Sequence, residues 1–180
     1  MNKKTNKMVK IAFLLAIALI VNYLESLVPL PIPLPGVKIG LANCLGLVVL
    51  CLYNEKDYIV FNIMKVFMIA LLRTGFGSSF LIGISGTLLA TISTLILYKV
   101  SKCSIYGLSV IGAVFHALGQ VLMVMLLYSN IYMINYLVVL EVASVISGVI
   151  TAFVASVTLQ KLPKSMVERS ENHGTQKRSR

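Results

Sequence analysis

Long apolar runs separated by short polar links make up most of this chain. A helix that spans a membrane needs about 20 mainly apolar residues, with a range of roughly 17–25. Apolar runs cover residues 9–28, 38–53, 57–72, 79–98, 107–128 and 133–160. The pattern therefore predicts an all-α integral membrane protein with six transmembrane helices. The second and third runs are short, and the tight link at residues 54–57 predicts that they form a hairpin.

The hydropathy pattern also divides the chain into two parts. Residues 1–162 are expected to form one six-helix transmembrane domain. Residues 163–180 are polar and basic and have no hydrophobic periodicity. This composition predicts a disordered cytoplasmic tail that touches membrane lipid.

Composition and charge placement are typical of a membrane protein rather than of one that binds nucleic acid. The 180 residues are 58% hydrophobic and only 12% charged, with a mean hydropathy of +0.90, whereas a soluble domain of this size needs more charge on its surface. Of the 16 Lys and Arg residues that give the net charge of +10, 13 fall on the side of the predicted bundle that holds both termini. The positive-inside rule then places both termini in the cytoplasm. The membrane itself is expected to be the plasma membrane.

The sequence lacks the patterns that support catalysis or metal binding. Cys44, Cys51 and Cys103 have no CxxC spacing, which predicts neither a disulfide framework nor a metal site. The chain has no DDxxD, GxxxxGK[ST], HExxH or GxSxG motif, and Asp57 is its only aspartate. We therefore expect no enzymatic activity, no metal and no cofactor. Work driven by ATP would require another subunit.

A proline-rich segment follows the first predicted helix. Pro29, Pro31, Pro33 and Pro35 alternate with apolar residues and lead into Gly36. Proline has no N–H and fixes φ at about −65°, so this run is expected to be extended rather than helical. Under the predicted topology it lies outside the cell, where we expect it to form a lid over a site between the helices.

Ionisable and amide side chains inside the predicted spans mark the expected ligand site. They are costly in a membrane, so each is a functional candidate. Lys65 either pairs with Glu141 or binds an acidic group of a ligand, with Arg73 as a second contact. His116 and Gln120 lie one helical turn apart and either contact the ligand or form an interhelical hydrogen bond. The predicted ligand-binding residues are Glu25, Lys38, Lys65, Arg73, His116, Gln120 and Glu141.

Small residues at four-residue spacing predict where helices approach closely, because apolar burial does not drive helix association in lipid. In the fourth and sixth runs such residues indicate packing inside the bundle. Ala12 and Ala16 form an AxxxA pair in the first run, among Leu, Ile and Phe. For this pair, packing inside the bundle and contact with lipid or a partner stay open as alternatives.

Three segments carry a resemblance to a known family. They are YLESLVPLPIPLPGVKIGLAN at residues 23–43, the stretch at 65–80, and GAVFHALGQ at 112–120. They resemble the family called heptaprenyl diphosphate synthase component I, or Gx transporter, which is similar to the six-helix substrate-binding S components of energy-coupling factor (ECF) transporters. The resemblance implies that Ala12 and Ala16 dock a transmembrane coupling subunit and that the proline lid closes over a ligand. The chain departs from the family pattern at Lys65, where Arg is usual, and at Ala117, where the pattern HNxGQ has Asn.

These features lead to one expected function and two alternatives. The expected function is a membrane substrate-binding subunit for the uptake of a small acidic molecule, energised by separate ATPase and coupling subunits. The first alternative is a non-transporting membrane partner of proteins in prenyl-quinone synthesis or flavin-linked electron transfer. The second, a membrane enzyme acting on a lipid diphosphate, rests only on Lys65 and Arg73.

Overall fold

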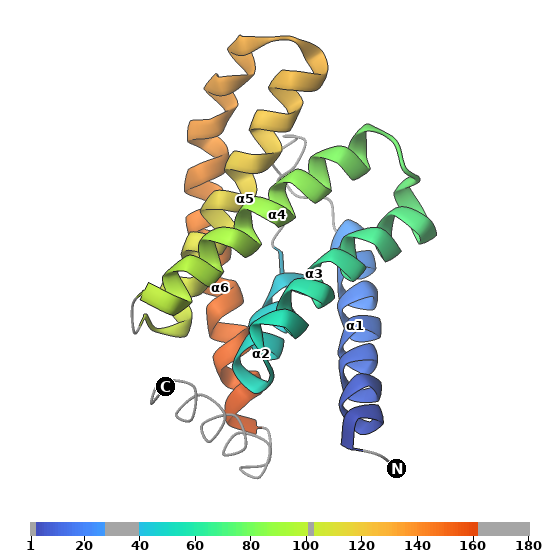
Figure 1. The fold of residues 1–180 in the computed structure, drawn as a ribbon. Coiled ribbons are helices and arrows are strands. Elements are labelled where there is room, and N and C mark those ends of the chain that lie inside the picture. Colours follow the sequence, from blue (N-terminus) through green and yellow to red (C-terminus); the bar gives the residue numbers. More distant parts are fainter. Residues whose placement is uncertain (1–2, 28–39, 101–102, 162–180) are drawn as a thin grey trace.

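The computed structural model describes residues 3–27, 40–100 and 103–161, and these residues form a bundle of helices (Figure 1). The helices are α1 (Lys3–Leu27), α2 (Ala42–Leu52), α3 (Glu55–Ile69), α4 (Ser78–Val100), α5 (Ile105–Tyr128) and α6 (Asn135–Lys161). A π-helical turn, η1 (Ala70–Thr74), continues α3, and a 3₁₀ turn, η2 (Ile131–Ile134), precedes α6. No strand occurs within the described ranges, so the all-α prediction is confirmed for them.

Four of the six predicted spans are helices that are long and apolar enough to cross a membrane. They are α1, α4, α5 and the continuous stretch of η2 and α6. The other two fall short of this length. At about 1.5 Å per residue, the 11 residues of α2 extend for only about 16 Å, roughly half of a hydrocarbon core of about 30 Å.

The short helix α2 is surrounded by the rest of the bundle. Residues 44–50 are all buried, and Val48 and Val49 are completely so. A helix that is apolar on every side is typical of a buried element. Its side chains form the main hydrophobic cluster with Ala18 of α1, Phe61 of α3 and Ala155 of α6.

Helices α4, α5 and α6 pack closely through small residues. A Cβ added to Gly119 would lie 2.8 Å from Gly86 Cα, and one added to Gly148 would lie 2.9 Å from Val110 Cα. Hydroxyl groups bridge the same contacts. Ser85 Oγ donates to the Gly119 carbonyl at 2.9 Å, and Ser109 Oγ donates to the Gly148 carbonyl at 2.7 Å. The predicted packing role of small residues in the fourth and sixth runs is therefore confirmed.

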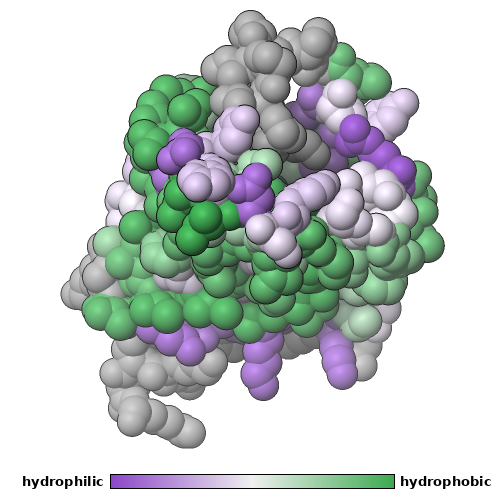
Figure 2. Space-filling view, turned by 90° about the horizontal axis from the view of Figure 1, so that it is seen from above, coloured by the Kyte–Doolittle hydropathy of each residue, from purple (hydrophilic) through white to green (hydrophobic). Residues whose placement is uncertain are grey.

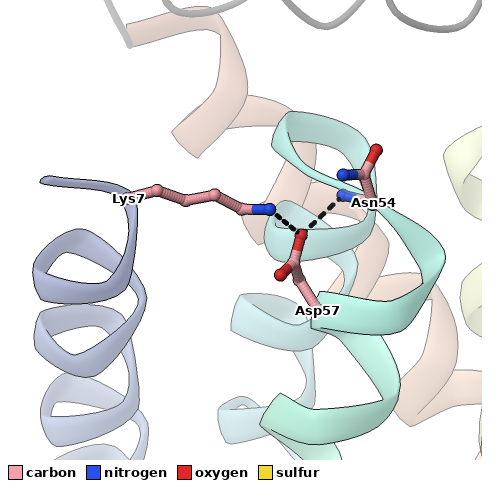
Figure 3. Close-up of polar contacts among 3 residues, drawn as sticks. All are labelled: Lys7, Asn54 and Asp57. Carbon is pink, nitrogen blue, oxygen red and sulfur yellow. Dashed lines mark hydrogen bonds and ion pairs between the residues drawn. The ribbon is translucent and has the colours of Figure 1, made fainter. Parts of the chain in front are cut away.

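Two ion pairs join three chain segments at one end of the bundle, which we call the ion-paired end. Lys7 Nζ lies 2.5 Å from Asp57 Oδ2, and Lys99 Nζ lies 2.9 Å from Glu55 Oε2. Asp57 also accepts a hydrogen bond from the Asn54 backbone N–H at 3.1 Å, which caps α3 (Figure 3). The N-terminal end of α1 and the C-terminal end of α6 both lie at the bottom of Figure 1. The start of α1, the α2–α3 link and the end of α4 thus share one end, as the charge pattern predicts.

The face of α1 that carries Ala12 and Ala16 is uncovered. Both alanines are exposed, as are Phe13 at 67% and Ile20 at 59% on the same side of the helix. Within the described residues, therefore, no part of this chain's own bundle covers the AxxxA pair. A face this apolar, on a helix of membrane-spanning length, suits lipid or another membrane helix.

Candidate functional site

A large cavity of about 710 Å³ lies among the helices. This volume is within the range of pockets that bind drug-sized molecules, about 300–1,000 Å³. All six helices and both short turns contribute residues to its wall. Seen from above, hydrophobic residues cover much of the periphery of the molecule and hydrophilic or weakly polar ones lie nearer the middle of this face (Figure 2). The polar wall residues are Asn22, Asn43, Lys65, Arg73, Thr74, Ser79, Thr87, His116, Gln120, Tyr128 and Tyr136.

Four of the seven predicted ligand-binding residues meet at this cavity. Lys65 and Arg73 come from α3 and its π-helical continuation, whereas His116 and Gln120 come from α5. His116 and Gln120 share a face because they are separated by one helical turn. The close crossing of α4 and α5 fixes that face, since a Cβ on Gly86 would lie 2.7 Å from the His116 carbonyl oxygen.

Lys65 is the most deeply buried charged group of the site, with 4% of its surface exposed. Its ammonium donates to Asn43 Oδ1 of α2 at 2.6 Å. No ion pair joins Lys65 to Glu141, so the alternative of a structural pair between them is wrong for this structure. An ammonium group has three N–H donors and no acceptor. Lys65 is therefore anchored by a neutral amide, and its positive charge is not cancelled by a direct carboxylate contact.

The π-helical turn η1 sets which residues beyond Lys65 face the cavity. The Gly75 N–H donates to the Ala70 carbonyl at 2.8 Å, five residues back. At about 100° per residue, Thr74 would lie about 180° around a regular helix from Lys65 and would face away. A π turn acts as a one-residue insertion and rotates the following residues back by about 100°. Thr74 and Arg73 consequently both line the cavity.

The electrostatic character of the wall favours an anion. Lys65 and Arg73 line the large cavity, and no Asp or Glu is among the described wall residues. A recess lined by one sign of charge with low-dielectric walls concentrates counter-charged molecules. The remaining wall is apolar and suits the body of an organic molecule; it comprises Val66, Ile69, Phe80, Ile82, Gly83, Val121, Val124, Met133 and Leu140.

Aromatic residues cluster where α3 passes through η1 into α4. The rings of Phe67 and Phe76 are 5.1 Å apart, and those of Phe76 and Phe80 are 5.2 Å apart in an edge-on arrangement. Such pairs contribute about 0.5–1.5 kcal/mol beyond their burial. Because Phe80 also lines the large cavity, the cluster braces the wall beside Arg73.

The three other predicted ligand-binding residues are placed differently. Glu25 Oε1 accepts the backbone N–H of Leu41 at 2.5 Å, which ties the end of α1 to the start of α2. Glu141 is partly buried on α6 beside the wall residue Leu140 but does not line the cavity, and its Oε2 has no hydrogen-bond partner. Lys38 and the predicted lid, Pro29 to Gly36, lie outside the described residues, as does the predicted tail at 163–180.

A small cavity of about 50 Å³ adjoins the large one. The two share Asn43, Lys65, Thr87 and His116, so these residues form the boundary between them. The threonines of α4 are among the small residues at four-residue spacing that predict helix packing. The structure shows that Thr87, Thr91 and Thr94 also border this polar space. These threonines are spaced along one face of α4, opposite Lys65 and Asn62 of α3. The sequence alone does not show that these two faces meet, because they come together only in the folded bundle.

The described residues contain no group of three or more His, Cys, Asp or Glu side chains that could hold a metal ion. A family model described as heptaprenyl diphosphate synthase component I matches residues 14–158. The match includes every described residue of the site and Ala16, whereas Ala12 precedes it. Comparisons with curated proteins and with solved structures gave no match.

Proposed function

The chain belongs to the heptaprenyl diphosphate synthase component I family, and we propose that it is a membrane substrate-binding subunit for the uptake of a small acidic molecule. The observation that carries this proposal is the large cavity with Lys65 and Arg73 in its wall and no carboxylate among its described wall residues. The ligand's acidic group would bind at Lys65, and its apolar body would contact the walls from α4 and α5.

The proposed architecture is a six-helix bundle like that of ECF S components. In this arrangement α2 and α3 occupy membrane depth although each is short, since protein surrounds α2 on all sides. The N- and C-termini are proposed to lie in the cytoplasm, together with the ion-paired end. The end of α1 and the start of α2 lie away from the ion-paired end, where the proposed proline lid would act on ligand arriving from outside.

Energy for transport would come from other chains, a coupling subunit and ATPases, because this sequence has no nucleotide-binding motif. The exposed Ala12 and Ala16 on α1 support this proposal. Small residues four apart allow a partner helix to approach closely in lipid. We propose this face as the docking surface for the coupling subunit.

The family description supports a second candidate function, because it names a component of a synthase. In that case the chain would be a non-transporting membrane partner of a prenyl diphosphate synthase, or of proteins in prenyl-quinone synthesis or flavin-linked electron transfer. We propose no catalytic role in either case, and turnover of a lipid diphosphate by the isolated subunit would contradict this.

Affinity purification from native membranes in a mild detergent discriminates the two functions. Transport predicts that a coupling subunit and ATPases co-purify, and that Ala12→Leu with Ala16→Leu releases them while Val142→Leu, a control at an exposed position on α6, does not. Recovery of a soluble synthase or flavoprotein without ATPases would favour the second function and refute the first.

A further inference from the structure

The small cavity has a polar wall that the ligand site does not explain. Beyond the four residues at the boundary, its wall includes the side chains of Tyr58, Asn62, Thr91, Thr94, Ser109 and Thr151. Tyr58 is three residues from the start of α3, and Thr94 is six residues from the end of α4. The small cavity therefore extends from Lys65 toward the ion-paired end.

Several of these polar groups already have protein partners. Asn62 Nδ2 donates to Thr91 Oγ1 at 3.1 Å, and Ser109 Oγ donates to the Gly148 carbonyl at 2.7 Å. Thr94 differs from them. Its side chain is only 1% exposed and its Oγ1 makes no hydrogen bond of standard geometry, although it lies close enough to the Tyr58 hydroxyl to interact with it. A buried polar group left in this condition costs about 1–3 kcal/mol.

At the other end of the small cavity, the Lys65 ammonium has N–H donors that require hydrogen-bond acceptors. Of its three ammonium donors, one is used by Asn43 Oδ1. Lys65 borders both cavities, so its remaining donors have free volume on two sides. A cation this deeply buried is stable only when hydrogen-bond acceptors surround it.

The volume of the small cavity indicates which molecules can form hydrogen bonds with both Thr94 and Lys65. An engineered apolar cavity of about 150 Å³ holds benzene, so a cavity of about 50 Å³ is too small for a ring. It has room for about two or three waters, each of which requires two to four polar partners. The wall supplies hydroxyl and amide groups in that number, and none of its described residues is an Asp or Glu that would recruit a cation.

We infer that the small cavity is a permanent hydration site, in which ordered waters join Lys65 to Thr94 and Tyr58. The waters accept a hydrogen bond from the ammonium and satisfy the Thr94 hydroxyl. Lys65 is then held by Asn43 on one side and by water on another, which leaves its remaining donor for the large cavity. Thr94 and Tyr58 are positioning residues in this arrangement, since they act on Lys65 through water.

Radiolytic hydroxyl-radical footprinting tests this inference, because radicals formed at bound water modify adjacent side chains that bulk solvent does not reach. Tyr58 and Phe61 are both buried, with 5% and 1% of their surfaces exposed, but only Tyr58 borders the small cavity. We expect Tyr58 to be modified at least severalfold faster than Phe61 in the purified full-length protein. Equal protection of the two rings would overturn the inference.

Thr94→Val provides a second readout of water in the small cavity. If waters occupy the cavity, the substitution removes one of their partners, slows Tyr58 modification severalfold and lowers the unfolding temperature. Thr94→Ser keeps the hydroxyl and is expected to retain fast modification of Tyr58. If the cavity is dry, Thr94→Val leaves the rate of Tyr58 modification unchanged, which would refute the inference. Neither readout depends on ligand uptake, so failure here is distinguishable from failure of the proposed function.

Discussion

The proposed ligand site centres on one residue, Lys65, whose positive charge is not paired with a carboxylate. The side chain is 4% exposed and donates to a neutral amide, that of Asn43, rather than to a carboxylate. Charged groups inside a membrane are rare and usually face a cavity or a partner. A lysine that borders a cavity while bound to an amide keeps its charge available for a ligand.

The Asn43 amide is predicted to stabilise Lys65 in the absence of ligand. Asn43→Leu removes the acceptor at 2.6 Å, and we expect it to lower the free energy of unfolding by about 1–3 kcal/mol, as for a lost hydrogen bond to a charged group. Asn135→Leu, an exposed control on α6, is expected to change it by less than about 0.5 kcal/mol. Thermal unfolding followed by size-exclusion chromatography measures both, and equal shifts would contradict the assignment.

At the scale of helices, packing between α4 and α5 fixes the positions of His116 and Gln120. Gly86 and Gly119 meet at the crossing, so each helix contacts the backbone of the other. On the opposite wall, the π-helical turn rotates Arg73 and Thr74 toward the same space. The two sides of the large cavity are thus built by different devices, a close crossing and a helical insertion.

Replacement of Gly119 tests the close crossing of α4 and α5. Alanine normally favours a helix over glycine by up to about 1 kcal/mol, but a Cβ on Gly119 would lie 2.8 Å from Gly86 Cα. We expect Gly119→Ala to be destabilising by about 1–3 kcal/mol because the backbone must move. Gly77→Ala is the matched control, since a Cβ there meets nothing within 4 Å. A neutral or stabilising effect of Gly119→Ala in thermal unfolding would show that the helices separate more easily than the structure implies.

The sequence predicts the long helices well and the short ones less well. The expected spans at 79–98 and 107–128 correspond to α4 (Ser78–Val100) and α5 (Ile105–Tyr128). The expected span at 38–53 is longer than the observed helix α2, Ala42–Leu52. An apolar run predicts a membrane span even where the helix is short and buried in protein, because hydropathy does not distinguish burial in protein from burial in lipid. The π turn at Ala70–Thr74 cannot be predicted from the pattern of apolar residues.

The site is predictable in part for a related reason. Spacing along one helix shows that His116 and Gln120 share a face, but it does not show which helix they meet. Glu25 and Glu141 are predicted ligand-binding residues because they are ionisable groups inside the expected spans, yet the structure places neither in the cavity wall. Residue spacing predicts a packing role for the threonines of α4, but it does not show that their polar neighbours come from α3, far away in sequence.

At the scale of the whole molecule, the ion-paired end gives the bundle a direction. The ion pairs Lys7–Asp57 and Lys99–Glu55 place the start of α1, the α2–α3 link and the end of α4 together. Most Lys and Arg residues fall in the segments that the sequence pattern predicts to lie at this end. The positive-inside rule therefore favours a cytoplasmic location for the ion-paired end. The large cavity extends toward the other end, through Arg73, Tyr128 and Met133.

Cys103 reports this orientation directly, because it is exposed in the link between α4 and α5. We expect a membrane-impermeant maleimide to label it in inside-out vesicles and not in intact cells. Ser78→Cys in a Cys103→Ser background moves the thiol to the start of α4 and is expected to reverse the pattern. Labelling of Cys103 from outside intact cells would invert the proposed topology.

The central claim is that Lys65 holds an acidic ligand in the large cavity, and native mass spectrometry in mild detergent tests it most directly. After incubation with a small-molecule extract of the source cells, the unmodified protein is predicted to carry a bound anion. Lys65→Met is expected to lose that added mass, and Lys56→Met, which removes an exposed lysine near the start of α3, is expected to keep it. Equal occupancy in the Lys65 and Lys56 variants, or no bound anion on the unmodified protein, would contradict the account.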